Sequence, residues 1–161
     1  MKKKLSADEA RIKAEAYCSA SEHCKSEVLT KLQQWGAPES VWQDILTHLE
    51  EERYIDERRY TAFFVRDKYR FNQWGRVKIS QALRFKHLSP SCIAEALDAI
   101  DETEYLGILG SLLQKKLRTI KAANDYERRG KLIRFAAGHG YEMDDILWCL
   151  KEMGCDDGSM D

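Results

Sequence analysis

Three segments of the 161-residue chain repeat one pattern of turn and apolar positions. Gly36, His87 and Gly140 share one position, 51 and then 53 residues apart. The same register aligns four further positions: Ala37, Leu88 and Tyr141, then Trp42, Ile93 and Ile146, then Leu46, Leu97 and Leu150, and then Leu49, Ile100 and Met153. Apolar residues spaced by three and four are typical of a buried helix face, and a period of this size is typical of stacked helical repeats. The register therefore predicts an all-α protein of three tandem three-helix repeats in an elongated, curved array.

The predicted repeats cover residues 8–54, 55–100 and 101–153, and a flexible tail follows at 154–161. In the first repeat, Ile12, Ala16 and Ala20 at spacing four indicate a helix over 8–20. Two more helices follow, with apolar faces at Val28, Leu29, Leu32 and Trp35 and at Val41, Trp42, Ile45, Leu46 and Leu49. Glycine after a helix tolerates positive φ, so Gly36 fits the turn between them.

Asp56 is expected to cap the first helix of the second repeat, where Tyr60, Phe64 and Phe71 fall on one arc. Gly75 is expected to allow the next turn. The following helix should carry a polar stripe of Arg76, Ser80 and Arg84. Ser89 should cap the helix after it, with Pro90 at its first position.

The third repeat is expected to open with a longer helix. Asn124 or Asp125 should cap the next one, and the last helix should bury an apolar face of Ile146, Leu147, Leu150 and Met153.

Composition excludes several classes of protein. The chain is 43% hydrophobic and 33% charged, which argues against general disorder, and it contains no apolar run of the ~18 residues that a membrane span needs. Its five cysteines form no C-x-x-C pair, which favours reduced thiols. We therefore expect a cytoplasmic protein without a membrane segment.

No catalytic or metal-binding constellation is recognised in the sequence. It contains no Gly-rich phosphate loop, no G-x-S-x-G and no H-E-x-x-H. His23 beside Cys24 is a weak candidate for a base and nucleophile, because adjacent helical residues do not face each other. Cys24 fits better as a small polar cap. The sequence predicts no catalytic residue, no metal site and no cofactor.

The strongest chemical signal is a basic and aromatic stretch in the middle repeat. From Arg58 to Lys86 there are nine basic residues against the single acid Asp67, and seven of the 16 aromatic residues of the chain. The whole chain has a net charge of −1. Interleaved cations and aromatics are typical of surfaces that meet phosphates, stacked bases or an acidic protein groove. The alternative, a helical hairpin with buried aromatics and solvated charges, fits the sequence equally well.

A second basic run, with eight basic residues against Asp125 and Glu127, lies between Lys115 and Arg134. If the repeats curve around a partner, the two runs could face it together. The candidate residues for a basic surface that binds protein or DNA are Arg59, Arg66, Lys68, Arg70, Arg76, Lys78, Arg84, Lys86, Lys115, Arg118, Arg128 and Arg134.

Three segments between roughly residues 10 and 153 contain motifs of a known protein family. Tyr54-Ile55-Asp56-Glu57, Arg59-Tyr60 and Phe64-Val65-Arg66 resemble Y-L-D-D-x-R-F-x-x-x-F-V-R. Trp74-Gly75-Arg76-x-x-Ile79 and Leu83 resemble W-G-P-x-x-I-x-x-x-L. Glu22-His23-Cys24 with Glu27, Val28 and Leu32 resembles E-H-S-x-x-E-L-x-x-x-L. Through these motifs the chain resembles the RecX family. It departs from the family at Cys24 (usually Ser), at Arg76-Val77 (usually with Pro) and at His87 (usually Gly).

The resemblance implies a modular protein of three-helix repeats that binds the RecA recombinase filament on single-stranded DNA. It implies inhibition of the recombinase, ATPase and coprotease activities of RecA, and so a role in homologous recombination, DNA repair and the SOS response. It implies no catalysis and no cofactor, and the expected protein is a monomer. The alternative is a free-standing helical repeat protein that binds single-stranded nucleic acid without RecA.

Overall fold

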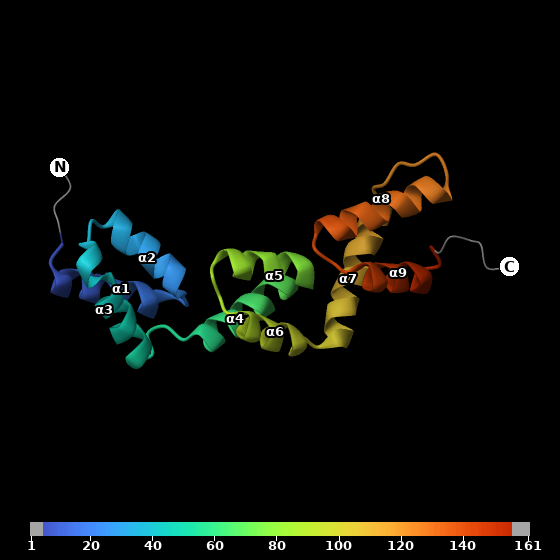
Figure 1. Ribbon diagram of the computed structural model, residues 1–161. Coiled ribbons are helices and arrows are strands. Elements are labelled where there is room, and N and C mark those ends of the chain that lie inside the picture. The colour runs from blue at the N-terminus through green and yellow to red at the C-terminus, as the bar shows by residue number, and fades with distance from the viewer. Residues whose placement is uncertain (1–4, 156–161) are drawn as a thin grey trace. The chain divides into compact units, whose positions relative to one another are not determined.

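The computed structural model describes residues 5–155, so the predicted tail lies outside the described residues from 156 onwards (Figure 1). Within residues 5–155 the chain forms nine helices and no strand. They are α1 (Ala7–Ala20), α2 (Lys25–Gln34), α3 (Glu39–Glu51), α4 (Glu57–Arg70), α5 (Arg76–Phe85), α6 (Pro90–Asp98), α7 (Glu102–Leu117), α8 (Asp125–Gly138) and α9 (Met143–Glu152). The expected all-α helical repeat fold is confirmed.

The helices belong to two compact units. The first contains the residues up to Phe63 together with Leu83–Ile93, and the second contains Phe64–Ala82 together with the residues from Ala94 onwards. The division passes through α4, α5 and α6, so each of these helices contributes one end to each unit. The predicted boundaries between the repeats fall between helices, and they stay a prediction.

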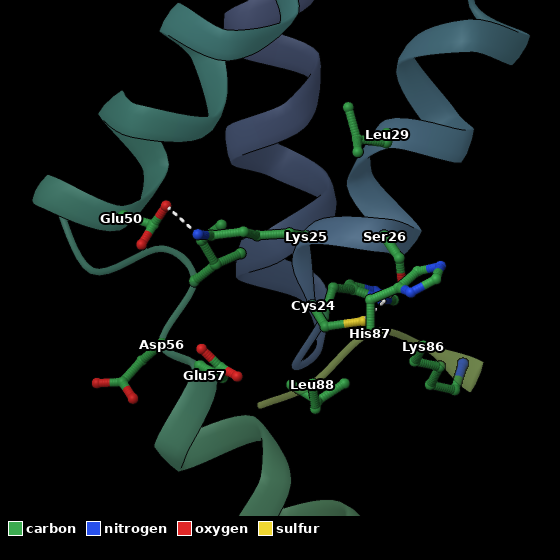
Figure 2. A pocket seen from close by; sticks show the side chains of 12 residues that line it. Cys24, Lys25, Ser26, Leu29, Glu50, Asp56, Glu57, Lys86, His87 and Leu88 are labelled. Atoms are coloured by element: carbon green, nitrogen blue, oxygen red, sulfur yellow. Dashed lines mark hydrogen bonds and ion pairs between the residues drawn. The ribbon is translucent and has the colours of Figure 1, made fainter. Parts of the chain in front are cut away.

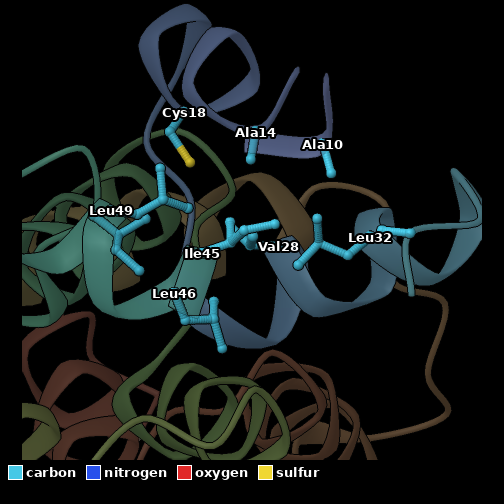
Figure 3. Packing of buried hydrophobic residues seen from close by; sticks show 10 residues of the cluster. Ala10, Ala14, Cys18, Val28, Leu32, Ile45, Leu46 and Leu49 are labelled. Atoms are coloured by element: carbon cyan, nitrogen blue, oxygen red, sulfur yellow. The ribbon is translucent and has the colours of Figure 1, made fainter. Parts of the chain in front are cut away.

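A cluster of aliphatic side chains forms the core of the first unit (Figure 3). Helix α1 contributes Ala10, Ala14 and Cys18, which face Val28 and Leu32 of α2 and three residues of α3. The helix was predicted correctly, but its expected stripe was wrong, because Ile12 is largely exposed. Small residues occupy the buried stripe, so α1 packs through its alanines and not through its largest apolar side chain.

The expected helix caps are present. The Asp56 carboxylate accepts a hydrogen bond from the Arg59 backbone at 2.9 Å. The Asn124 side chain accepts one from the Glu127 backbone at 2.8 Å, which settles the choice between Asn124 and Asp125. The Ser89 hydroxyl accepts a hydrogen bond from the Cys92 backbone at 3.3 Å, and Pro90 is the first residue of α6. These side chains satisfy backbone donors that the first turn of a helix leaves without partners.

One turn residue in each repeat ends the preceding helix in the same way. Gly36, His87 and Gly140 all have positive φ, at 78°, 66° and 95°. The next residue in each segment is buried and donates its backbone N–H to the carbonyl five residues earlier. These bonds run from Ala37 to Leu32 at 3.0 Å, from Leu88 to Leu83 at 3.2 Å and from Tyr141 to Ala136 at 3.2 Å. This is the Schellman motif, so His87 adopts the left-handed conformation usually given to glycine.

The turn between α8 and α9 closes over the start of α5 in the second unit. The backbone N–H of Gly75 donates to the carbonyl of His139 at 2.8 Å, and that of Val77 donates to the carbonyl of Gly140 at 2.9 Å. The N–H of Arg76 donates to the Tyr105 hydroxyl at 2.9 Å. Because α5 has no capping side chain at Gly75, groups of the third repeat satisfy its first donors.

Gly75 therefore has a role other than the expected one. The residue with positive φ in this turn is Gln73, at 58°. A Cβ on Gly75 would lie 2.3 Å from the backbone of Gly140, which is closer than any real contact. Glycine is needed here because two backbones meet.

Candidate partner-binding surface

Five of the predicted basic residues form ion pairs within the chain. Arg59 bonds Glu22 at 2.7 Å and Lys86 bonds Glu27 at 3.3 Å in the first unit. In the second unit Arg70 bonds Glu104 at 2.5 Å, Arg128 pairs with Asp125, and Arg76 contacts several acids. The hydrogen bond from Arg70 also lowers the pKa of Glu104. A charge that is already paired gains less from an external anion, so these five residues are weaker candidates for contact with a partner.

Arg76 is the most constrained of the five. Its guanidinium lies 2.6 Å from Glu102, 3.1 Å from Glu142 and 3.6 Å from Asp145, and its side chain is 21% exposed. It also stacks over the Tyr105 ring at 4.2 Å. Burial, together with the carboxylates of Glu142 and Glu102, raises the pKa of Asp145. Arg76 therefore fastens the start of α5 to α7 and α9, in addition to the backbone bonds above.

The expected polar stripe on α5 was wrong in part. Ser80 is buried, and Arg76 turns into the carboxylate cluster instead of towards solvent. Arg84, at the end of the helix, is exposed. A serine hydroxyl is small enough to be accommodated between helices, which a charge pattern in the sequence does not reveal.

Lys68 and Lys78 lie against aromatic rings. The Lys68 ammonium is 5.3 Å from the Phe64 ring centroid and 5.0 Å from that of Trp74, and the Lys78 ammonium is 4.5 Å from Trp74. Phe64 and Trp74 meet edge to face at 6.5 Å. Within residues 5–155 neither lysine forms an ion pair with a carboxylate. We call Phe64, Lys68, Trp74 and Lys78 the Trp74 cluster.

The Trp74 cluster combines two properties of an anion-binding surface. A cation over an exposed aromatic face gains only ~0.5–1 kcal/mol, so most of the electrostatic free energy of each ammonium stays available to a partner. The rings are half-buried, which fixes their positions and leaves part of each ring accessible. Phe64 and Trp74 are thus only partly buried, whereas three other residues of the family motifs, Tyr60, Ile79 and Leu83, are buried.

The remaining predicted residues lie on exposed parts of the second unit. They are Arg66 on α4, Lys115 near the end of α7, Arg118 directly after it, and Arg134 on α8. Phe71 was predicted to share a helical arc with Tyr60 and Phe64, but it follows the last residue of α4 and is 79% exposed. Sequence reasoning missed Lys116, whose ammonium lies 4.9 Å from the Phe135 ring.

The first unit contains a pocket of about 330 Å³ at the start of α2 (Figure 2). The side chains of Cys24, Ser26, Glu57, Lys86 and His87 surround it. The Lys25 ammonium pairs with the Glu50 carboxylate at 2.7 Å, so these two opposite charges in the pocket wall neutralise each other. The pocket is small, mixed in polarity and without a dominant charge.

The two residues that could suggest a nucleophile and base are held apart. The Cys24 sulfur lies 3.2 Å from the Ser26 hydroxyl, and the backbone N–H of Cys24 donates to Glu27 at 3.0 Å. The His23 ring stacks on Tyr17 at 3.7 Å and bonds the Ser21 hydroxyl at 2.9 Å. Cys24 thus begins α2 as expected, and His23 serves packing.

Residues 5–155 offer neither a metal site nor a membrane span. No group of three or more His, Cys, Asp or Glu side chains could hold a metal ion there. In the same residues no helix has both the length and the apolar character to cross a bilayer.

Comparison with known proteins identifies the family. Residues 56–97 match the family model described as the second three-helix domain of RecX, and residues 102–150 match the model of the third. The regulatory protein RecX of Chlorobaculum tepidum is 31% identical over 129 residues, which is 80% of this chain and 78% of that protein. The RecX of Clostridium botulinum strain Eklund 17B is 32% identical over 80% of this chain, which spans 60% of that longer protein.

Solved structures agree on the fold. The crystal structure of RecX from Lactobacillus salivarius has a TM-score of 0.80 at 18% identity, over 92% of this chain and 96% of that one. A second crystal structure of a regulatory protein RecX has a TM-score of 0.79 at 23% identity, over 90% of this chain and 74% of that one. The sequence relatives, the matched family models and the helical repeats lead to one conclusion: this chain belongs to the RecX family of regulatory proteins.

Proposed function

We propose that this protein binds RecA filaments on single-stranded DNA and inhibits the recombinase, ATPase and coprotease activities of RecA. The proposal includes a cytoplasmic monomer of three repeats, with the boundaries predicted above, acting in recombination, DNA repair and the SOS response. The observation that carries it is the similarity to a regulatory protein RecX over four-fifths of the chain. The exposed cations of the second unit supply a physical means of binding.

We assign the contact to cations that have no carboxylate partner among residues 5–155. These are Lys68 and Lys78 of the Trp74 cluster. Further candidates are the exposed residues Arg66, Lys115, Arg118 and Arg134. The other predicted residues that pair with carboxylates of this chain gain less from an anionic partner. They are Arg59, Arg70, Arg76, Lys86 and Arg128. Complementary charge accelerates association and fixes register, while a partly exposed Trp is a common anchor of affinity.

The test is the DNA-dependent ATPase of RecA with this protein titrated in. A regulator of this kind should lower the steady-state rate at substoichiometric or equimolar ratios to RecA. An unchanged rate at several-fold excess over RecA would contradict the proposal.

A free-standing nucleic-acid binder is the second candidate, favoured by the same unpaired cations. Salt separates the two. A protein that tracks phosphates loses affinity log-linearly with salt, because each neutralised phosphate releases a counterion. Tight binding to single-stranded DNA without RecA, with a steep slope of this kind, would support the second candidate.

A further inference from the structure

Helix α9 presents large apolar side chains on the side that faces away from its own core. Ile146, Cys149 and Leu150 are buried, whereas Leu147 is 36% exposed and Trp148 is 50% exposed. The expectation that Leu147 belongs to the core was therefore wrong. An exposed Trp beside an exposed Leu is unusual for a helix that already buries its other face, and exposed apolar patches often mark interaction sites.

Two opposite charges flank this apolar pair along the same face. Asp144 and Lys151 are both exposed and lie seven residues apart, which returns a helix to nearly the same angle after two turns. Neither forms an ion pair among residues 5–155. Along this face, an acid near the start of α9 is followed by the apolar pair and then by a base near the end of the helix.

This order is complementary to itself. The midpoint between Asp144 and Lys151 is also the midpoint between Leu147 and Trp148. If a second α9 lies antiparallel across a two-fold axis at that midpoint, Asp144 of each copy opposes Lys151 of the other. Leu147 of each copy then opposes Trp148 of the other. A two-fold interface requires this reciprocity, because residue i contacts j and j contacts i.

We propose that the exposed face of α9 binds a second copy of this chain through an antiparallel α9–α9 contact. One face of a ten-residue helix is small against the ~1,200 Å² that stable interfaces bury, so the dimer is weak. A dissociation constant on the order of 100 μM leaves the protein monomeric at micromolar concentration. The face contains none of the basic residues assigned above, so this inference and the proposed function can fail independently.

Charge reversal gives a sharp test by sedimentation velocity between about 10 μM and 1 mM. Asp144→Lys places two lysines opposite each other at both ends, and Lys151→Asp does the same with two acids. Each variant alone should dimerise at least tenfold more weakly than the wild type. An equimolar mixture of the two variants restores both ion pairs, and should associate as well as the wild type does.

Two further variants keep the result interpretable. Trp148→Ala should abolish the association with no change of charge, and Glu51→Lys, a reversal at an exposed position of α3, should leave it unchanged. Circular dichroism of each variant checks that α9 remains folded. A wild type that stays monomeric at 1 mM overturns the proposal. That result is also expected if this face binds a different protein. A mixture that associates no better than its components also overturns it.

Discussion

Replacing Gly75 by alanine tests the closest backbone contact in the second unit. The new Cβ would lie 2.3 Å from the backbone carbon and oxygen of Gly140 and from the nitrogen of Tyr141. All three are backbone atoms, which cannot rotate away as a side chain can. The turn between α8 and α9 must then retreat from the start of α5 by about 1 Å before the contact becomes an ordinary one.

That retreat has a cost that can be estimated from the structure. It strains or breaks the hydrogen bonds from Gly75 to His139 at 2.8 Å and from Val77 to Gly140 at 2.9 Å. Each is worth ~1 kcal/mol, and overpacking adds ~1–3 kcal/mol. We expect Gly75→Ala to lower the free energy of unfolding by about 3–5 kcal/mol, and the melting temperature by roughly 10 °C.

Gly107→Ala is the matched control, measured by thermal unfolding followed by circular dichroism. Gly107 lies inside α7 and has open space where a Cβ would be added. Alanine is the better helix former, so the control should raise the free energy of unfolding by ~0.5–1 kcal/mol. If Gly75→Ala melts within 2 °C of the wild type, the argument for close packing is refuted.

Three further changes test other parts of the account. Tyr105→Phe removes the hydroxyl that donates to Glu142 at 2.7 Å and accepts from the Arg76 backbone at 2.9 Å, and should cost about 2 kcal/mol in urea unfolding; a loss under ~0.5 kcal/mol would contradict this role. His87→Gly relieves the positive φ of 66° and should stabilise by about 0.5 kcal/mol, whereas His87→Val should destabilise; equal stabilities would mean that the turn is not left-handed. The hydrogen bond from Arg70 lowers the pKa of Glu104. The stability that this ion pair contributes is therefore present above the ordinary pKa of a glutamate and is lost as pH falls through the lowered pKa. Glu104→Gln should therefore flatten the decline in melting temperature below about pH 4.5, and an unchanged decline would count against the pair.

Local signals in the sequence were sufficient to predict the helices and the repeat. Left-handed turns after helices, short polar caps and apolar spacing all act within a few residues, so Gly36, Asp56 and Ser89 are recognisable without any structure. At His87, where the aligned residues are glycines, the sequence allowed either a left-handed residue or a different turn, and the structure has the left-handed residue. Alanine stripes carry a weaker signal, and for that reason the buried face of α1 was misassigned.

The partners of the basic residues could not be predicted, because they come from distant parts of the chain. Arg76 meets Glu102, Glu142 and Asp145, and Arg70 meets Glu104 on α7. Only the packing of the second unit brings these groups together. The sequence therefore identified the basic residues as a set but did not separate those that hold the fold from those that stay available to a partner.

We expect the inhibition of RecA to depend on the lysines of the Trp74 cluster, which have no carboxylate partner among residues 5–155. The direct measurement is the concentration of protein that halves the DNA-dependent ATPase of RecA, for the wild type and for Lys68→Ala/Lys78→Ala. The matched control is Lys13→Ala/Lys31→Ala, which also removes two charges. It removes two ammonium–ring contacts, at Trp35 and Tyr17 in the first unit, where the Lys68 and Lys78 variant removes three.

The concentration that halves the RecA ATPase should be at least tenfold higher for the Lys68 and Lys78 variant, which corresponds to a loss of ~1.4 kcal/mol in binding. For the control variant this concentration should change little. Both variants should melt close to the wild type, because exposed cation–aromatic contacts are weak. Equal inhibition by all three proteins, or an equal loss in both variants, would contradict the claim.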